Sequence, residues 1–217
     1  MSFPATHIYY MEQQLNQTNL DPYFSLGLVF PDVRYELGIE RTITHPELTS
    51  EDRMLEHLFH KVPDEYSSDE QKIQVGMYCH VYHDYWWRDH TMPDTDDEIP
   101  RSAVHIADDM ICFEFLDRSY YIDALQSVRE ASVPYLDSSQ TPAFVDRVIA
   151  YLSSEEYDPS EIMHYWIKKK GWSQIEVDAV IATARELLLE KEFTEKIRHL
   201  KDSQWDSKIL ERISKFS

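Results

Sequence analysis

The chain is poor in cysteine, in glycine and in long apolar runs. Its 217 residues include two cysteines and four glycines. Cys79 and Cys112 form no paired metal-binding motif, and so few cysteines indicate a reduced setting. No apolar run is long enough to span a bilayer, and the N-terminus lacks a basic segment followed by an apolar one. We therefore expect a cytoplasmic protein without a signal peptide or a transmembrane segment.

Basic residues are also scarce. The chain has 21 lysines and arginines against 40 aspartates and glutamates, which gives a formal net charge of −19. Non-specific nucleic-acid binding requires a basic face, so this charge argues against that class of protein. The acids indicate either a well-solvated surface or carboxylates that a bound metal neutralises. The sequence indicates no particular oligomeric state.

Strand-type alternation of apolar and polar residues is scarce, which predicts an all-α fold. The apolar fraction of 42% is ordinary for a globular protein, and the length suits one large domain or a domain with a helical appendage. The pattern changes after Pro134. We therefore expect a helical core over residues 1–133, which holds the candidate ligands described below, and a helical extension over 134–217 that packs on it.

Apolar periodicity and helix-end signals predict the individual helices. Ser50 is the expected cap of one helix, and Thr141-Pro142 starts another. Loops are expected at Asp32, at His45 and over residues 91–100. Helices are expected over residues 7–15, 24–30, from 51 onward, and over 68–87, 102–130, 141–151, 158–171, 173–200 and 205–216.

The stretch from Gly76 to His90 is the most informative part of the sequence. Residues at steps of three and four form one helix stripe there, which is apolar at both ends and ionisable in the middle. The stripe consists of Ile73, Met77, His80, Asp84 and Trp87. His80 and Asp84 leave the same helix face, one turn apart. Burying them among aromatic residues is costly unless a partner such as a metal cation binds both. Gly76 predicts close approach of another backbone or a ligand.

Histidines are concentrated in the first half of the chain, where eight of the ten lie between His7 and His105. The spacing His-x-x-x-Asp occurs twice and places an imidazole and a carboxylate on one helix face, as zinc accepts from a helix. The pairs are His80 with Asp84 and His105 with Asp109. Three further candidate ligands are His90, soon after the first pair, and Asp32 and His45, upstream of both pairs.

Two of these assignments have competitors. His83 is an alternative to His80 as a ligand, and Asp108 is an alternative to Asp109. For His80 and Asp84, the alternative to metal binding is a buried hydrogen-bonded pair. The remaining histidines are expected to have ordinary core or surface roles: His57, His60, His164 and His199.

The order and spacing of these residues resemble a known family. The relevant segments are Thr6-His7-Ile8, Leu26-Gly27-Leu28-Val29-Phe30-Pro31-Asp32-Val33-Arg34-Tyr35, Thr44-His45 and Gly76-x-x-x-His80-x-x-x-Asp84-Tyr85-x-Trp87. Over roughly residues 1–130 the chain resembles the zinc-dependent phospholipase C family, whose all-α fold is shared with single-strand-specific nucleases of fungi and plants. The resemblance implies a multi-helix bundle, here with extra C-terminal helices.

The resemblance also implies a set of ligands. Asp32, His45, His80 and Asp84 would hold one zinc ion, and His90, His105 and Asp109 a second. Asp84 would bridge to a third ion that His7 also binds. Secreted family members complete that third site with an N-terminal tryptophan, and this chain has no tryptophan near its start. The expected cofactor is therefore one to three zinc ions, with another divalent metal as the alternative.

The expected function is metal-dependent hydrolysis of a phosphoester, with a small phosphoester or a phospholipid as substrate. The resemblance suggests that Asp32 orients or deprotonates the attacking water. One alternative is an HD-type metal phosphohydrolase acting on nucleotides, because His83-Asp84 is an adjacent His-Asp doublet with His45 upstream. A second alternative is a non-catalytic helical protein in which the metal stabilises the core.

Overall fold

The computed structural model describes residues 4–48, 50–60, 68–91, 98–133, 136–137, 139–157, 171–202 and 204–217. These residues form helices and connections without any strand, which confirms the predicted all-α class. None of the helices in these ranges is both long and apolar enough to cross a membrane.

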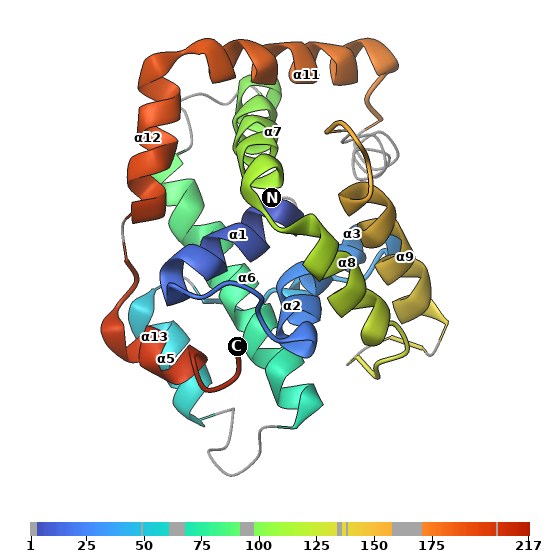
Figure 1. Ribbon diagram of the computed structural model, residues 1–217, viewed down its shortest axis with the longest axis vertical. Coiled ribbons are helices and arrows are strands. Elements are labelled where there is room, and N and C mark those ends of the chain that lie inside the picture. The colour runs from blue at the N-terminus through green and yellow to red at the C-terminus, as the bar shows by residue number, and fades with distance from the viewer. Residues whose placement is uncertain are drawn as a thin grey trace.

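The first part of the chain forms helices of which α1, α2 and α6 lie in the middle of the molecule (Figure 1). Their bounds are α1 Pro4–Leu15, α2 Pro22–Val29, η1 Phe30–Val33, α3 Arg34–Leu37, α4 Arg41–Thr44, α5 Glu51–His60, α6 Asp69–Thr91, α7 Glu98–Phe115 and α8 Arg118–Ser127. The later helices are α9 Gln140–Leu152, α11 Gln174–Leu189, α12 Lys191–Asp202 and α13 Ser207–Ile213.

The C-terminal helices pack against the earlier ones. Helix α11 lies across the end of α7, α12 packs against α1 and α6, and α13 packs against α5 (Figure 1). The backbone N–H of Trp205 donates to the side chain of Gln14, at 2.8 Å, and Arg212 Nε donates to the carbonyl of Leu58, at 3.3 Å. Apolar side chains of α13 also share one core with those of α1, α2 and α6.

Several predicted helix starts are present. The Ser50 hydroxyl accepts from the backbone N–H of Arg53, at 3.3 Å, at the start of α5. Ser173 and Glu176 form a capping box at the start of α11, which satisfies N–H groups that have no partner within the helix. The central helix begins one residue after the predicted Ser68 and continues to Thr91.

Other boundaries were wrong. Asp32 lies in the 3₁₀ turn η1 rather than in a loop, and His45 directly follows the one-turn helix α4. The helix predicted over 102–130 is broken at Asp117, whose side chain caps α8. The helix predicted over 173–200 is broken at Glu190, whose backbone is extended.

Two further predictions fall largely on undescribed residues. The helix predicted over 158–171 lies outside the described residues except at its end. Of the loop predicted over 91–100, Thr91 belongs to α6 and residues 98–100 belong to α7, while 92–97 lie outside the described residues.

Helices α2 and α6 cross at two glycines. A Cβ atom added to Gly76 would lie 2.3 Å from the carbonyl oxygen of Phe24, and one added to Gly27 would lie 2.2 Å from that of Ile73. Real Cβ atoms do not come this close to backbone oxygens, so the crossing requires glycine on both helices. The close approach expected at Gly76 is thus confirmed, and it brings η1 close to the middle of α6.

We expect Gly76→Ala to destabilise the protein by about 2 kcal/mol, the upper end of the balance between two effects. Overpacking costs about 1–3 kcal/mol, and here the clash is with backbone, while alanine recovers about 1 kcal/mol through its helix propensity. Urea unfolding monitored by circular dichroism measures the change. The control is Gly38→Ala, where an added Cβ meets nothing within 4 Å and only the φ of +68° is strained. A smaller loss for Gly76→Ala than for this control would contradict the account.

Candidate metal centre

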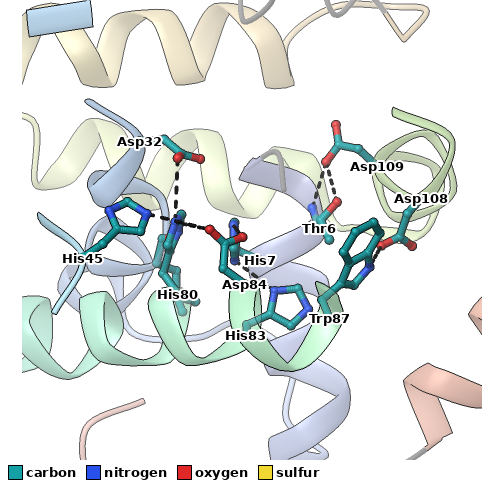
Figure 2. Close-up of polar contacts among 11 residues, drawn as sticks. Thr6, His7, Asp32, His45, His80, His83, Asp84, Trp87, Asp108 and Asp109 are labelled. Carbon is teal, nitrogen blue, oxygen red and sulfur yellow. Dashed lines mark hydrogen bonds and ion pairs between the residues drawn. The ribbon is translucent and has the colours of Figure 1, made fainter. Parts of the chain in front are cut away.

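Five of the predicted ligands converge on one region of the structure (Figure 2). They come from four different segments, namely α1, η1, the residue after α4, and the middle of α6. Two overlapping groups have all their donor atoms within 4.8 Å of one another: His7 with Asp32 and His80, and His45 with His80 and Asp84.

The distances within this cluster are those of atoms around an ion rather than of direct hydrogen bonds. His45 Nε2 lies 3.7 Å and His80 Nε2 lies 3.9 Å from Asp84 Oδ2. His80 Nε2 also lies 3.8 Å from Asp32 Oδ1. Ligands bound tetrahedrally at about 2.0–2.1 Å from zinc are spaced about 3.4 Å apart. Small side-chain movements would therefore place the donor atoms of either group around one ion.

The carboxylate of Asp84 faces histidines with both oxygens. Oδ2 faces His45 and His80, whereas Oδ1 lies 3.8 Å from His7 Nε2. A carboxylate that bridges two ions presents its oxygens to two positions in this way. The geometry is therefore compatible with one ion beside His45 and His80 and with another beside His7.

The hydrogen bond at Nδ1 of His80 shows which of its ring nitrogens offers a lone pair to the cluster. His80 Nδ1 lies 2.7 Å from the carbonyl oxygen of Leu28, which can only accept. Nδ1 therefore carries the proton, and in the neutral ring Nε2 has the free lone pair. The Nδ1 of His45 lies 2.9 Å from the hydroxyl of Thr44, which can donate or accept, so this contact does not fix the tautomer of His45.

Several atoms that face the cluster are buried and lack hydrogen-bond partners among the described residues. They are the Nε2 atoms of His7, His45 and His80, and Oδ1 of Asp32. Buried polar atoms are nearly always hydrogen-bonded, because an unmade bond costs the full desolvation penalty. Cations at one or both of the two candidate positions would satisfy these atoms, so the donor set fits a metal site.

The pKa values in the cluster suit metal binding. Burial lowers the pKa of His80 to about 3 and also lowers those of His45 and His7. These imidazoles are neutral at neutral pH, the form that coordinates metals. Burial, together with the charge of Asp84, raises the pKa of Asp32 to about 8. Burial also acts to raise the pKa of Asp84, but neighbours that include His45 and His80 hold it well below its usual value.

The two carboxylates form the solvent-facing edge of the cluster. The side chains of Asp32 and Asp84 are 18% and 11% exposed, whereas those of His45 and His80 are fully buried. Solvent therefore contacts the cluster from the carboxylate side.

The predicted ligand Asp109 has a different environment. Its Oδ1 accepts from the backbone N–H and the hydroxyl of Thr6, both at 2.9 Å. Its Oδ2 accepts from the hydroxyls of Tyr157, at 3.0 Å, and Tyr151. Burial raises the pKa of Asp109 to about 7. The carboxylate thus fastens the first turn of α1 to α7 and to the tyrosines at and beyond the end of α9.

We expect Asp109→Ala to destabilise the protein by about 3 kcal/mol even without metal. The change leaves the buried donors of Thr6 and Tyr151 and the half-buried hydroxyl of Tyr157 without their acceptor. Each lost acceptor costs about 1–3 kcal/mol, and water that enters the space recovers part of this. Unfolding in urea with a chelator present measures this effect. The exposed Asp123→Ala is the matched control and should change stability by less than about 0.5 kcal/mol. Equal stability of the two variants would show that the Asp109 bonds contribute little.

The structure does not gather the second predicted zinc group among the described side chains. His105 stacks on Trp87, with ring centroids 4.2 Å apart, and Asp108 accepts from Trp87 Nε1 at 2.7 Å. Neither His105 nor Asp109 belongs to a described group of three candidate ligands. The side chain of His90 lies outside the described residues, so this second zinc group stays a prediction.

The other histidines divide between the cluster and the rest of the fold. His80, not His83, has its Nε2 facing Asp84, while His83 contacts His7. His57 Nδ1 lies 2.9 Å from the carbonyl of Arg53 in its own helix, and His60 is exposed. His164 and the side chain of His199 lie outside the described residues. No described residue beyond 134 contributes to the candidate metal groups.

Sequence reasoning missed two sets of contacts. One is the pairing of His83 with His7, and the other is the anchoring of Thr6 by Asp109. Thr6 lies within the first turn of α1 and donates to Asp109 instead of capping the helix, so no local sequence signal predicts the second contact. Comparisons with protein-family models, curated proteins and solved structures found no match to this chain.

Proposed function

We propose that this protein is a metal-dependent phosphoester hydrolase that binds zinc or another divalent metal. The observation that carries the proposal is the convergence of buried imidazole nitrogens and carboxylate oxygens, spaced 3.7–3.9 Å apart, at an edge that solvent reaches. The residues that would hold the metal are His7, Asp32, His45, His80 and Asp84. The order of these ligands along the chain, which resembles that of the zinc-dependent phospholipase C family, supports the assignment of the chemistry.

A bound divalent metal supplies Lewis acidity and neutralises charge on the phosphoryl group. The protein's part is to keep the site from repelling an anion. Its imidazoles are neutral, so a single divalent ion balances the two carboxylates of Asp32 and Asp84, and a second ion would make the site positive. An acidic protein can therefore accept a phosphoester here, because the bound cations dominate the local field.

Within the proposal, Asp32 is the residue that acts on water. Its Oδ1 faces His80, and its side chain is the more exposed of the two carboxylates. One oxygen can therefore contact the ligand position while the other holds a water molecule at the rim. Within the proposal, Asp32 orients this water and removes its proton.

One observation bears on the HD-type alternative. In that interpretation the histidine of the His83-Asp84 doublet would share the metal with Asp84. His80 Nε2 is instead the α6 nitrogen that lies 3.9 Å from Asp84, whereas His83 Nδ1 lies 3.1 Å from His7 Nδ1. This favours the first interpretation over the HD type.

The test is hydrolysis by the purified, zinc-loaded protein. Release of p-nitrophenol from mono- and diester substrates and of diacylglycerol from phospholipid vesicles would be followed with and without chelator. We expect turnover of at least one class, lost with chelator and restored by added metal. If the loaded protein hydrolyses none of these, the non-catalytic metal-binding interpretation replaces the hydrolase.

A further inference from the structure

His83 is a buried histidine beside the candidate metal centre. It lies on α6 next to Asp84 and is 1% exposed. Its ring packs against the ring of Tyr10, with centroids 4.5 Å apart. It also lies beside the ring of Trp86, with centroids 6.3 Å apart. These contacts fix the plane of the imidazole, so the direction of its nitrogens is set by packing.

The polar contact of His83 is with another histidine. Its Nδ1 lies 3.1 Å from Nδ1 of His7 (Figure 2). Two imidazole nitrogens at this distance form a hydrogen bond only when one carries the proton and the other accepts. Two arrangements are open to neutral rings, with either His7 or His83 as the donor.

The other contacts of His7 distinguish the two arrangements. His7 Nε2 lies 3.8 Å from Asp84 Oδ1, and the residue His7 belongs to the candidate group with Asp32 and His80. To offer a lone pair at Nε2, a neutral His7 must carry its proton on Nδ1. His7 is then the donor and His83 the acceptor. The proton of a neutral His83 is then on Nε2, which is buried and has no hydrogen-bond partner among the described residues. His80 follows the same pattern, since its Nδ1 is held by the carbonyl of Leu28 while Nε2 faces the cluster.

We propose that His83 is a positioning residue for His7, whose Nδ1–H it accepts, so that the lone pair of His7 Nε2 points at the ligand position beside Asp84. The inference rests on the metal site proposed above. Outer partners of this kind fix the tautomer and direction of a ligating imidazole, and their loss typically lowers metal affinity about 10–100-fold.

Two substitutions separate the hydrogen bond from packing. His83→Phe keeps a ring between Tyr10 and Trp86 but removes the acceptor, whereas His83→Asn places an acceptor oxygen close to the original Nδ1. Zinc affinity and stoichiometry would be measured by titration against a competing chelator. We expect His83→Phe to weaken binding of the ion beside His7 about 10–100-fold and His83→Asn to restore it to within about threefold. His57→Phe, at a buried histidine outside the cluster, should match the parent.

Ring-nitrogen NMR of the ¹⁵N-labelled, metal-free parent protein tests the same hydrogen bond without metal. The proposal predicts a proton on Nδ1 of His7 and a lone pair on its Nε2. A proton on Nε2 of His7, or zinc binding by folded His83→Phe equal to that of the parent, would overturn it. If the parent binds no zinc, the proposed function fails, and the NMR spectrum still decides the tautomer.

Discussion

The double variant His80→Ala/Asp84→Ala is expected to lose metal binding. These residues place Nε2 and Oδ2 3.9 Å apart in the centre of the cluster, and Asp84 also faces His7 and His45. Structural zinc sites with four ligands have binding free energies of about 10–16 kcal/mol. Removing two ligands should therefore cost about 5 kcal/mol or more. This cost lowers the affinity by more than three orders of magnitude. Elemental analysis after dialysis against trace zinc measures the retained metal.

The matched control for this variant is Glu56→Ala/His60→Ala. These residues are also a carboxylate and an imidazole spaced four apart on one helix, but they lie on α5 and are exposed. Circular dichroism verifies that both double variants keep their helix content. Full metal retention by folded His80→Ala/Asp84→Ala would place the metal elsewhere in the protein.

Asp32→Asn is expected to lower turnover much more than it lowers metal content or stability. Asparagine keeps the size and one oxygen of aspartate but removes the charge and the base. Loss of a general base typically costs about 10²–10⁴ in rate. The pKa of Asp32 is raised to about 8 in the metal-free protein, and a nearby cation would favour the ionised form that can accept a proton. Steady-state hydrolysis of the best p-nitrophenyl substrate, at matched metal content, measures the change.

A fully active Asp32→Asn would remove Asp32 from the chemistry and leave it as a metal ligand at most. Asp21→Asn provides a comparison, because Asp21 is a partly buried carboxylate paired with Lys72 at 2.7 Å and capping α2 outside the cluster. Its substitution should lower stability without changing turnover per bound metal.

The parts of the fold that could be predicted are those set by local spacing. A step of four residues placed His80 and Asp84 on one face of α6, and the glycine inside that helix indicated a close crossing. The break at Asp117 was also accessible in principle, since aspartate is a preferred cap. It was missed because the apolar pattern continues across it from α7 into α8.

The rest of the site depends on contacts between distant residues. Thr6 and Asp109 are 103 residues apart, and His7 and His83 are 76 apart. The spacing His105-x-x-x-Asp109 predicts a shared helix face, but it cannot show that Thr6, Tyr151 and Tyr157 donate to the Asp109 carboxylate. A periodic pattern identifies which side chains are buried together on one helix, whereas the opposing helices decide what those side chains bind.

Anomalous X-ray scattering at the zinc edge from crystals of the zinc-loaded protein tests the central claim most directly. The account predicts an anomalous peak within coordination distance of His45 Nε2, His80 Nε2 and Asp84 Oδ2, and any peak beside His7 on the Oδ1 side of Asp84 would mark a second ion. Absence of zinc from this cluster, with ordered side chains and zinc bound elsewhere or not at all, would contradict it.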